Sequence, residues 1–550
     1  MLRHSIFLVV VLWPLFGGGA ERPGGVEFSA RGGLRQSPVV LALVPRQAAP
    51  VYFTTNGTPA SPTNGMRYTE PLRLVTTTTV RAVAAEPGTN AAAEQVATFI
   101  FPEAVLRQTG AGLPVHWGTN RGLAVPADYA MDPEVVTNAA YRNSMRAALE
   151  SLPALALTLA PADLFGGERG LYTHPQESGE AWERPAFVEF FPTNGAAGFR
   201  GPAGLRVQGG WNRRPDESPK HSFRLVFKKK YGAAKLKFPL FGGGVKEFDQ
   251  LILRGGNNHS WLHWSAAERR AADYLRDQWM RESYAAMGRV SARGRFVHLY
   301  LNGLYWGIYN LAERPDEHFA AAHLGGRAGD YDTRNADKIL SGDDDAWKRL
   351  FALANRGVTS KDQLDAVGEL LDVPAFCDYL LLNLYGANAD WDAASNWYAA
   401  RQRSATGRFV FFVWDGERTL EKTTDNRLAV DDDFCPTRLW QKLRACPEFR
   451  ELFARQARGH LTGAGVLTPA PVAHRFRQLS DALDPAIVAE SARWGDYRRD
   501  VHPYKEAPYE LYTRDEHWRP EVQRLLGDYF PKRTPIFIEQ LQAAKLYPAD

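Results

Sequence analysis

Two runs of aromatic and β-branched residues around Asn302–Gly303 constrain the fold of this chain most strongly. Residues 295–313 read RFVHLYLNGLYWGIYNLAE, and Asn-Gly is the pair that two-residue hairpin turns favour. The sequence therefore predicts a β-hairpin here, and further short strands precede it from about residue 184. Residues 265–288 interrupt the strands with apolar side chains at every third or fourth position, which predicts a helix that ends at Gly288.

Helical patterns dominate the chain after residue 313, as in DDAWKRLFALANRG and SKDQLDAVGELLD. A strand-rich part followed by a helix-rich part is typical of the α+β class. The chain has 550 residues, more than one hydrophobic core usually holds, so two or three domains are expected.

The composition excludes several classes of protein. The net charge of +4 argues against a dedicated nucleic-acid-binding protein. Only three cysteines occur, Cys377, Cys435 and Cys446, so neither a disulfide scaffold nor a cysteine zinc site is expected. Cys435 and Cys446 either pair in an oxidising compartment or remain single thiols.

The first 20 residues have the layout of a secretory signal peptide. A basic start is followed by an apolar stretch from Ile6 to Phe16 and by small residues that end at Ala20. No later apolar run is long enough for a membrane span. The mature protein is therefore expected to be secreted, periplasmic or at the cell surface. The alternative is that the segment is retained as an anchor.

Residues 30–103 form a separable block of short β-rich runs divided by Pro, Gly and Asn, which predicts a small antiparallel β-sandwich. The run VYFTTNGTPASPTNGMRYTEPLRLVTTTTVRAVA resembles the module named after the C-terminal domain of chitobiase and β-hexosaminidase. Such modules are accessory domains, so the block is interpreted as a spacer or a polysaccharide contact. Residues 104–183 are interpreted as a transition segment.

Residues 388–417 place acidic residues and an Asn at both open ends of a predicted hairpin. With Ser404–Gly407 as the turn, Asn396 falls opposite Asp415, and paired residues have Cα atoms about 5 Å apart. Asp390 and Asp392 lie just upstream and Glu417 just downstream. Carboxylate and amide oxygens are the ligands that Mg²⁺ and Mn²⁺ prefer. The alternative is a solvated hairpin whose acidic ends cap neighbouring helices.

Protein kinases use the same order of chemical groups. A catalytic Asp precedes a metal-binding Asn by a few residues, and a second metal-binding Asp follows a short hairpin. The chain has this order, but it contains no H-R-D, D-F-G or V-A-I-K motif.

Five blocks between about residues 185 and 420 resemble the spore coat protein H (CotH) kinase family. They read LRVQGGWNRRPDESPKHSFRLVFKKKYG, DYLRDQWMRESYAAMG, VHLYLNGLYWGIYNLAERPDEHF, NLYGANADWDAASNWYAARQ and FVWDGE. The resemblance implies an atypical protein-kinase-like domain over residues 184–550, with a strand-rich lobe at 184–313 and a helical lobe at 314–550. It also implies phosphate transfer from ATP to protein Ser/Thr hydroxyls with Mg²⁺ or Mn²⁺.

The resemblance assigns roles at the acidic end. Asp390 matches the acid before the Asn and would act as the base that orients a hydroxyl, and Asp392 competes for this role. Asn396 and Asp415 would hold the metal ion. After the hairpin, the family usually has the sequence W-D-x-D. Here Glu417 stands in place of the last Asp, so its contact with a metal ion is left open.

The resemblance also assigns basic and hinge residues. Lys220 would pair with the ATP phosphates, with Arg206 and Arg224 as rivals, and its acidic partner is expected within 265–288, at Glu268 or Asp273. The second interpretation of these basic residues is a solvated edge strand. Leu311 and Glu313 would belong to the hinge that contacts adenine.

Two functions therefore compete. The first is an exported CotH-type kinase that acts on a protein substrate. The second is an inactive spore-coat or cell-envelope assembly protein that is attached through the sandwich. A third interpretation, a carbohydrate-active enzyme, is supported only by the name of the sandwich module. No pair of carboxylates outside the hairpin indicates a sugar-binding cleft.

Overall fold

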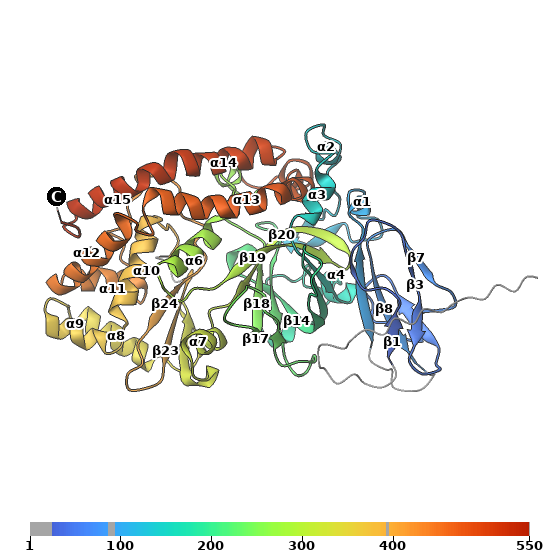
Figure 1. Ribbon diagram of the computed structural model, residues 1–550, viewed down its shortest axis with the longest axis horizontal. Coiled ribbons are helices and arrows are strands. Elements are labelled where there is room, and N and C mark those ends of the chain that lie inside the picture. The colour runs from blue at the N-terminus through green and yellow to red at the C-terminus, as the bar shows by residue number, and fades with distance from the viewer. Residues whose placement is uncertain (1–24, 86–93, 392–394, 549–550) are drawn as a thin grey trace, which may run out of the picture.

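The computed structural model describes residues 25–85, 94–391 and 395–548. Figure 1 shows a β-rich module at one end of the long axis, a barrel in the middle and most helices at the other end. The expected signal peptide at 1–20 lies outside the described residues. Among the described residues, no helix has the length and apolar character that a bilayer crossing requires.

The N-terminal module is rich in β-strands, as predicted. Its five-stranded sheet has the order β2-β9-β8-β5-β6, and two strand pairs, β1-β4 and β3-β7, accompany it. All pairs are antiparallel except β2-β9, which is parallel. Leu41, Phe53, Val80 and Phe99 belong to its buried core. The strands are β1 (Val26–Phe28), β2 (Gly33–Leu34), β3 (Val39–Leu41), β4 (Leu43–Pro45), β5 (Val51–Thr54), β6 (Met66–Arg67), β7 (Leu72–Leu74), β8 (Thr78–Ala84) and β9 (Gln95–Ile100).

A closed barrel follows, with the strand order β12-β13-β14-β15-β18-β20-β19. β12 comes from the segment expected to be a transition, and it closes the barrel by pairing in parallel with β19 and antiparallel with β13. The strands are β12 (Ala154–Thr158), β13 (Arg184–Phe191), β14 (Arg200–Gln208), β15 (Ser222–Val226), β18 (Gln250–Arg254), β19 (Gly294–Leu301) and β20 (Leu304–Glu313).

The Asn302–Gly303 hairpin forms as predicted. Leu301 pairs with Leu304, and both turn residues have positive φ, 48° for Asn302 and 83° for Gly303. Positive φ at both central residues is what a type I′ turn requires, and the twist of that turn matches the flanking strands.

Side chains alternate along the barrel strands, as in any β-strand. Leu205, Phe223, Leu253 and Leu311 belong to one buried cluster inside the barrel. Their even-numbered neighbours on β14, β15 and β18 point the other way, and Arg206, Arg224 and Arg254 are among them. The barrel therefore turns a row of basic side chains outward.

The helix predicted over 265–288 is two helices, α5 (Ala266–Arg270) and α6 (Arg276–Ala286). Tyr274 between them has a φ of 63°, which an α-helix cannot accommodate. The Asp273 carboxylate accepts the Leu275 N–H at 2.7 Å, and this local hydrogen bond competes with a continuous helix.

The remainder is mainly helical. α9 begins with a capping box between Ser360 and Gln363, and the Asp372 carboxylate caps α10. The longest helix, α13, extends beside the barrel and packs against β20 (Figure 1). The helices are α7 (Glu317–Leu324), α8 (Asp345–Asn355), α9 (Lys361–Gly368), α10 (Val373–Tyr385), α11 (Pro436–Leu443), α12 (Pro447–Leu461), α13 (Pro469–Trp494), α14 (Arg519–Arg524) and α15 (Phe530–Ala543).

A four-stranded sheet of order β22-β21-β23-β24 lies within this helical part. Its strands are β21 (Tyr331–Asn335), β22 (Lys338–Ser341), β23 (Trp397–Gln402) and β24 (Val410–Val413). All three cysteines are buried and none forms a disulfide, so Cys435 and Cys446 do not pair.

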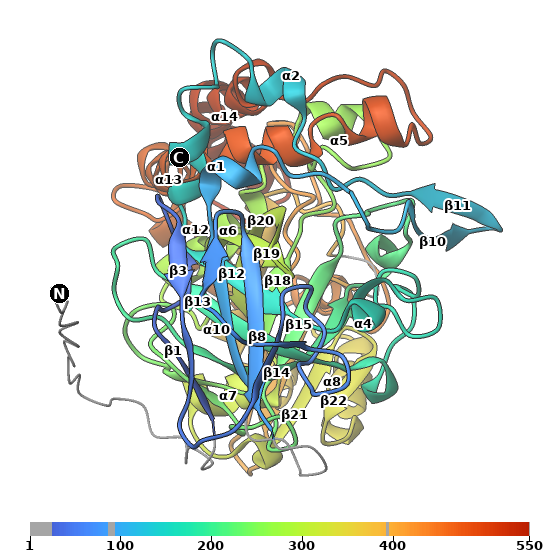
Figure 2. The same cartoon turned by 90° about the vertical axis from the view of Figure 1, so that its right-hand side faces the viewer.

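The short elements connect the larger ones. Figure 2 shows the hairpin of β10 and β11 projecting from the body of the molecule. These elements are α1 (Pro102–Val105), β10 (His116–Asn120), β11 (Leu123–Pro126), α2 (Pro133–Val136), α3 (Met145–Glu150), α4 (Pro161–Phe165), β16 (Leu236–Lys237) and β17 (Glu247–Phe248).

Candidate functional site

A cavity of about 740 Å³ lies between the outward face of the barrel and the β23-β24 hairpin. Six of the residues singled out from the sequence line it: Arg206, Arg224, Asp390, Asn396, Asp415 and Glu417. Lys220, Leu311 and Glu313 are not among its lining residues. Asp392 lies outside the described residues.

The β23-β24 hairpin is present, but its register differs by one residue from the predicted one. Trp397 pairs with Val413 and Ala400 with Val410, so the connection is centred on Ala405 and replaces the predicted four-residue turn. Asn396 is therefore not paired with Asp415. A one-residue slip is not visible in this sequence because both strands are apolar on both faces.

Asn396 and Asp415 leave the ladder in the left-handed region, with φ values of 68° and 59°. The Asn396 amide donates to Asp390 Oδ2 at 2.7 Å and to the Asp390 carbonyl at 3.1 Å. Left-handed backbone at non-glycine residues is uncommon and costs free energy, and such residues gather at functional sites. The hairpin ends are thus shaped to present side chains to the cavity.

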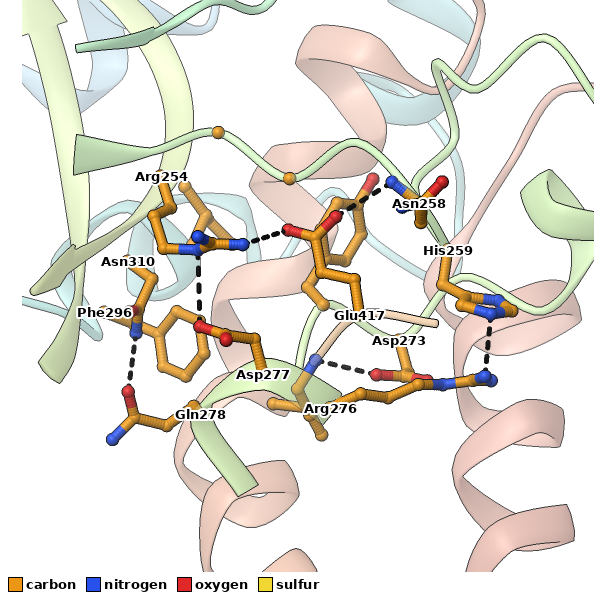
Figure 3. A pocket seen from close by; sticks show the side chains of 15 residues that line it. Arg254, Asn258, His259, Asp273, Arg276, Asp277, Gln278, Phe296, Asn310 and Glu417 are labelled. Carbon is orange, nitrogen blue, oxygen red and sulfur yellow. Dashed lines mark hydrogen bonds and ion pairs between the residues drawn. The ribbon is translucent and has the colours of Figure 1, made fainter. Parts of the chain in front are cut away.

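Arg254, the last residue of β18, connects the strand-rich and helical parts at this cavity. Its Nη2 lies 2.5 Å from Asp415 Oδ1 and 2.7 Å from Glu417 Oε1, and its Nε lies 3.3 Å from Asp277 Oδ2 on α6. Figure 3 shows Arg254 reaching Asp277 on one side and Glu417 on the other. The guanidinium also lies over the Trp414 ring, 4.9 Å from its centroid.

Two of the three carboxylate neighbours of Arg254 are held in place by main-chain groups. Glu417 Oε2 accepts the N–H groups of Asn257 and Asn258 at 3.2 and 2.9 Å, the second of which is drawn in Figure 3. Asp277 Oδ1 accepts the Gly416 N–H at 3.0 Å. These contacts fix the segment after β24 against α6.

The sequence analysis missed Arg254 and Asp277. The available signal was the position of Arg254 at the end of a predicted strand, directly before Gly255 and Gly256. Asp277 lies in the first turn of α6, where it carries no distinguishing pattern.

Three carboxylates meet two guanidinium groups at this point, because Asp277 also binds Arg281 Nε at 2.9 Å. Burial, together with the nearby Asp415 and Asp277, raises the pKa of Glu417 to about 8 against the opposing effect of Arg254. Burial opposes ionisation of Asp277 as well, but Arg254 and Arg281 outweigh it, so its pKa is lowered. The cluster therefore crowds three carboxyl groups around two guanidinium groups, and a bound cation would relieve the crowding that raises the pKa of Glu417.

This crowding of carboxyl groups fits a divalent cation beside Asp415. Within the described residues, no three His, Cys, Asp or Glu side chains form a metal cage. Mg²⁺ does not need one, because it usually takes one or two carboxylates together with substrate phosphates. Asp415 and the Asn396 amide oxygen would hold it, and Glu417 is already bound through both oxygens.

Lys220 lies in a different place from the one expected. Its Nζ is 2.5 Å from Glu490 Oε1 on α13 and 2.7 Å from the Ile308 carbonyl. The ion pair is buried, with 1% of each side chain exposed, and burial lowers the pKa of Lys220.

The expectation that residues 265–288 supply the partner of Lys220 is wrong. Glu268 instead accepts the His259 N–H at 2.9 Å, and Asp273 pairs with Arg276 at 2.6 Å. Neither carboxylate contacts Lys220, because α13, which is far away in sequence, covers that part of the barrel.

The expected hinge residues are enclosed. Leu311 pairs with Leu253 on one side and Arg295 on the other, within the barrel core. Glu313 binds His323 Nε2 at 2.9 Å and the Arg293 N–H at 2.9 Å. The next residue, Arg314, does line the cavity.

Comparisons with known proteins identify two segments. Residues 41–101 match the family described as Fn3 associated, so the module is of that type, and the likeness to the chitobiase module stays a prediction. No curated protein matches the chain. Residues 205–533 match the family described as CotH kinase protein, and this segment includes Arg254, Asp277, Asp390 and Asp415. The match covers more than half of the 550 residues, so the chain belongs to the CotH kinase protein family.

Proposed function

We propose that the protein transfers phosphate from ATP to Ser/Thr hydroxyl groups of a protein substrate, with Mg²⁺ or Mn²⁺ as the metal ion. The observation that carries this proposal is the contact of Arg254 with both Asp277 and Asp415. In protein kinases a strand Lys pairs with a Glu of the following helix, and both must be in place beside the metal-binding Asp.

The order of elements supports the proposal. β14, β15, β18, β20 and β19 are neighbours in that order, and α6 lies in sequence between β18 and β19. Arg254 on β18 and Asp277 on α6 then stand where a kinase has its strand Lys and helix Glu. An Arg in this position keeps its charge at any physiological pH and offers several donors to phosphate oxygens.

The loop between β14 and β15 also supports phosphate binding. Gly209 and Gly210 line the cavity, and Gly209 has a φ of 123°. This positive φ favours glycine, and a Cβ there would also require the Asn212 side chain to move. Such a loop allows the backbone to approach phosphate oxygens closely.

At the hairpin, Asp390 would accept the proton of the substrate hydroxyl and orient it toward the transferred phosphate. Asn396 holds the Asp390 carboxylate at 2.7 Å through its amide nitrogen, which leaves the amide oxygen for the metal ion. The bound metal ion would neutralise charge on the phosphates. Arg254 keeps Asp415 and Glu417 in position.

The test uses purified protein with labelled ATP and either Mg²⁺ or Mn²⁺. We expect metal-dependent ATP binding and autophosphorylation or transfer to a supplied protein, and loss of both in Asp415→Asn. Asp337→Asn is the matched control, because Asp337 is an exposed carboxylate that lines the same cavity. The absence of ATP binding in the wild type, or equal behaviour of the two variants, would refute the proposal.

The alternative function is an inactive assembly protein of the spore coat or cell envelope. It is favoured by one observation, the complete set of contacts that both Glu417 oxygens already make with Arg254, Asn257 and Asn258. The Fn3-associated module would then contact polysaccharide. Retention of envelope binding by a protein that neither binds ATP nor transfers phosphate would support this alternative.

A further inference from the structure

The end of the cavity away from Asp415 is basic. Arg206 on β14 pairs directly with Arg224 on β15, and Arg224 pairs with Ile252 on β18, so the three side chains lie in one row across the sheet. Arg314, just after β20, lines the same cavity. Arg254 lies two residues further along β18 than this row.

The hydrogen bonds of Arg224 leave its charge without a counterion. Gln208 Oε1 accepts hydrogen bonds from Arg224 Nε at 2.9 Å and from Arg224 Nη2 at 2.5 Å. Within residues 25–85, 94–391 and 395–548, no carboxylate forms a salt bridge with Arg224. Burial, together with the charge of Arg314, lowers the pKa of Arg224 to about 9. Arg224 is half-buried, and a cation that is partly withdrawn from water with only neutral partners is costly in free energy.

Arg314 is also incompletely satisfied. It is buried, and its Nε has no hydrogen-bond partner among the described residues. Its Nη1 binds Gln250 Oε1 at 3.3 Å and Asp316 Oδ2 at 3.2 Å. The other Asp316 oxygen caps α7 through His318 and Phe319.

Arg206 adds to the positive charge at the rim of the row. Its Nε binds Glu183 Oε2 at 2.7 Å, but Lys230 shares the same carboxylate group at 2.9 Å. With Lys228 and Glu180, which join the same cluster, two carboxylates thus face three cations. The two ends of the cavity therefore differ in sign, with excess carboxylates near Asp415 and excess guanidinium groups near Arg224.

We propose that Arg224 and Arg314, with Gln208 and Arg206, form a second anion subsite that binds a phosphate group. An Arg guanidinium matches the geometry of phosphate oxygens and forms charge-assisted hydrogen bonds with them. A purine base alone would leave Arg224 without a counterion and Arg314 with Asp316 as its carboxylate partner. The inference rests on the proposed function in one respect, because the nucleotide is proposed to bind in the same cavity. The bound phosphate belongs either to the nucleotide or to a second, phosphorylated molecule.

The first experiment measures binding of inorganic phosphate to the full chain by calorimetry, with no divalent metal present. We expect binding by the wild type and by Asp415→Asn, which removes a metal ligand but not the subsite. Arg224→Leu should weaken binding roughly tenfold or more, because a hydrogen bond to a charged group is lost. Arg224→Lys should retain part of the affinity.

Lys338→Gln is the matched control, because Lys338 is an exposed cation that lines the same cavity and its loss changes the charge equally. It should bind phosphate like the wild type. Thermal unfolding confirms that each variant is folded. If the wild type does not bind phosphate, or if Lys338→Gln weakens binding as much as Arg224→Leu, the subsite does not exist.

Competition identifies the source of the phosphate. If ATP displaces inorganic phosphate and Arg224→Leu weakens ATP binding, the subsite holds a phosphate of the nucleotide. If phosphate and ATP bind together, it holds a phosphate of a second molecule. Adenosine tests whether the site binds the base instead. If adenosine displaces phosphate and binds Arg224→Leu more tightly than the wild type, the site is a pocket for the base and the proposal is overturned. Loss of transfer activity alone leaves the phosphate result unchanged, so the two proposals fail separately.

Discussion

Lys220 and Glu490 form a buried ion pair that joins the barrel to α13, with 2.5 Å between Nζ and Oε1. Glu490 Oε2 also accepts the Ile308 N–H at 2.7 Å, and Lys220 donates to the Ile308 carbonyl. The ion pair therefore satisfies both hydrogen-bonding groups of the Ile308 main chain, the N–H and the carbonyl. It holds the two parts of the kinase-family segment together, away from the lining of the cavity.

Replacing Lys220 by Met should destabilise the protein by about 3–5 kcal/mol, because it leaves the buried Glu490 carboxylate without its cation. The double variant Lys220→Met/Glu490→Gln should recover part of this loss, since Gln is uncharged and still accepts the Ile308 N–H. Urea unfolding of the three proteins measures the difference. Normal stability of Lys220→Met combined with weaker ATP binding would instead support a role for Lys220 at the phosphates.

Arg254→Lys should lower the rate of phosphate transfer by roughly 10²-fold, a size typical for the loss of one preorganised charge contact. A Lys carries one ammonium group, so it cannot contact Asp277, Asp415 and Glu417 together as the guanidinium does. Steady-state kinetics with ATP varied gives kcat and KM. Arg293→Gln, at a guanidinium that binds the Gly242 carbonyl, is the control and should leave both constants unchanged.

Asp390→Asn should reduce kcat by about 10²- to 10⁴-fold while ATP binding is retained, because a base acts on the hydroxyl and not on the nucleotide. The Asn396 amide binds the Asp390 carboxylate, whereas Asp392 lies outside the described residues, so the choice between the two stays a prediction. Asp392→Asn, made in parallel, is the direct comparison. A larger loss of kcat in Asp392→Asn would assign the base to Asp392.

Glu189 makes the contact between the barrel and the N-terminal module sensitive to pH. Its Oε2 accepts the Thr98 N–H at 2.8 Å, and burial raises its pKa to about 7 from an ordinary value of 4.5. Between these two values the folded protein binds more protons than the unfolded chain does. The free energy of unfolding should therefore fall as the pH rises from 4.5 to 7, by at most about 1.4 kcal/mol per pH unit.

Glu189→Gln should flatten this part of the pH dependence, because Gln accepts the same hydrogen bond and does not titrate. Thermal unfolding of both proteins at several pH values between 5 and 8 is the measurement. Glu103→Gln, at an exposed position on α1, should behave like the wild type. An identical pH profile for Glu189→Gln and the wild type would contradict the expected role of this carboxylate.

The sequence by itself determined the features that depend on neighbours along the chain. The Asn302–Gly303 hairpin, the β-rich module and the division into strand-rich and helical parts follow from local periodicity, turn residues and caps. The acidic residues at 390, 415 and 417 were also found, since they flank a recognisable hairpin, and the structure brings them to one cavity.

Only the tertiary structure decided which distant groups meet. Lys220 and Glu490 are 270 positions apart, and Arg254 and Asp415 are 161 apart, so no local pattern relates them. The tertiary structure also decided that β12 closes the barrel and that the β23-β24 ladder is shifted by one residue. Such contacts arise because burying a charge is costly in free energy unless a partner is packed against it, and that partner is set by the whole fold.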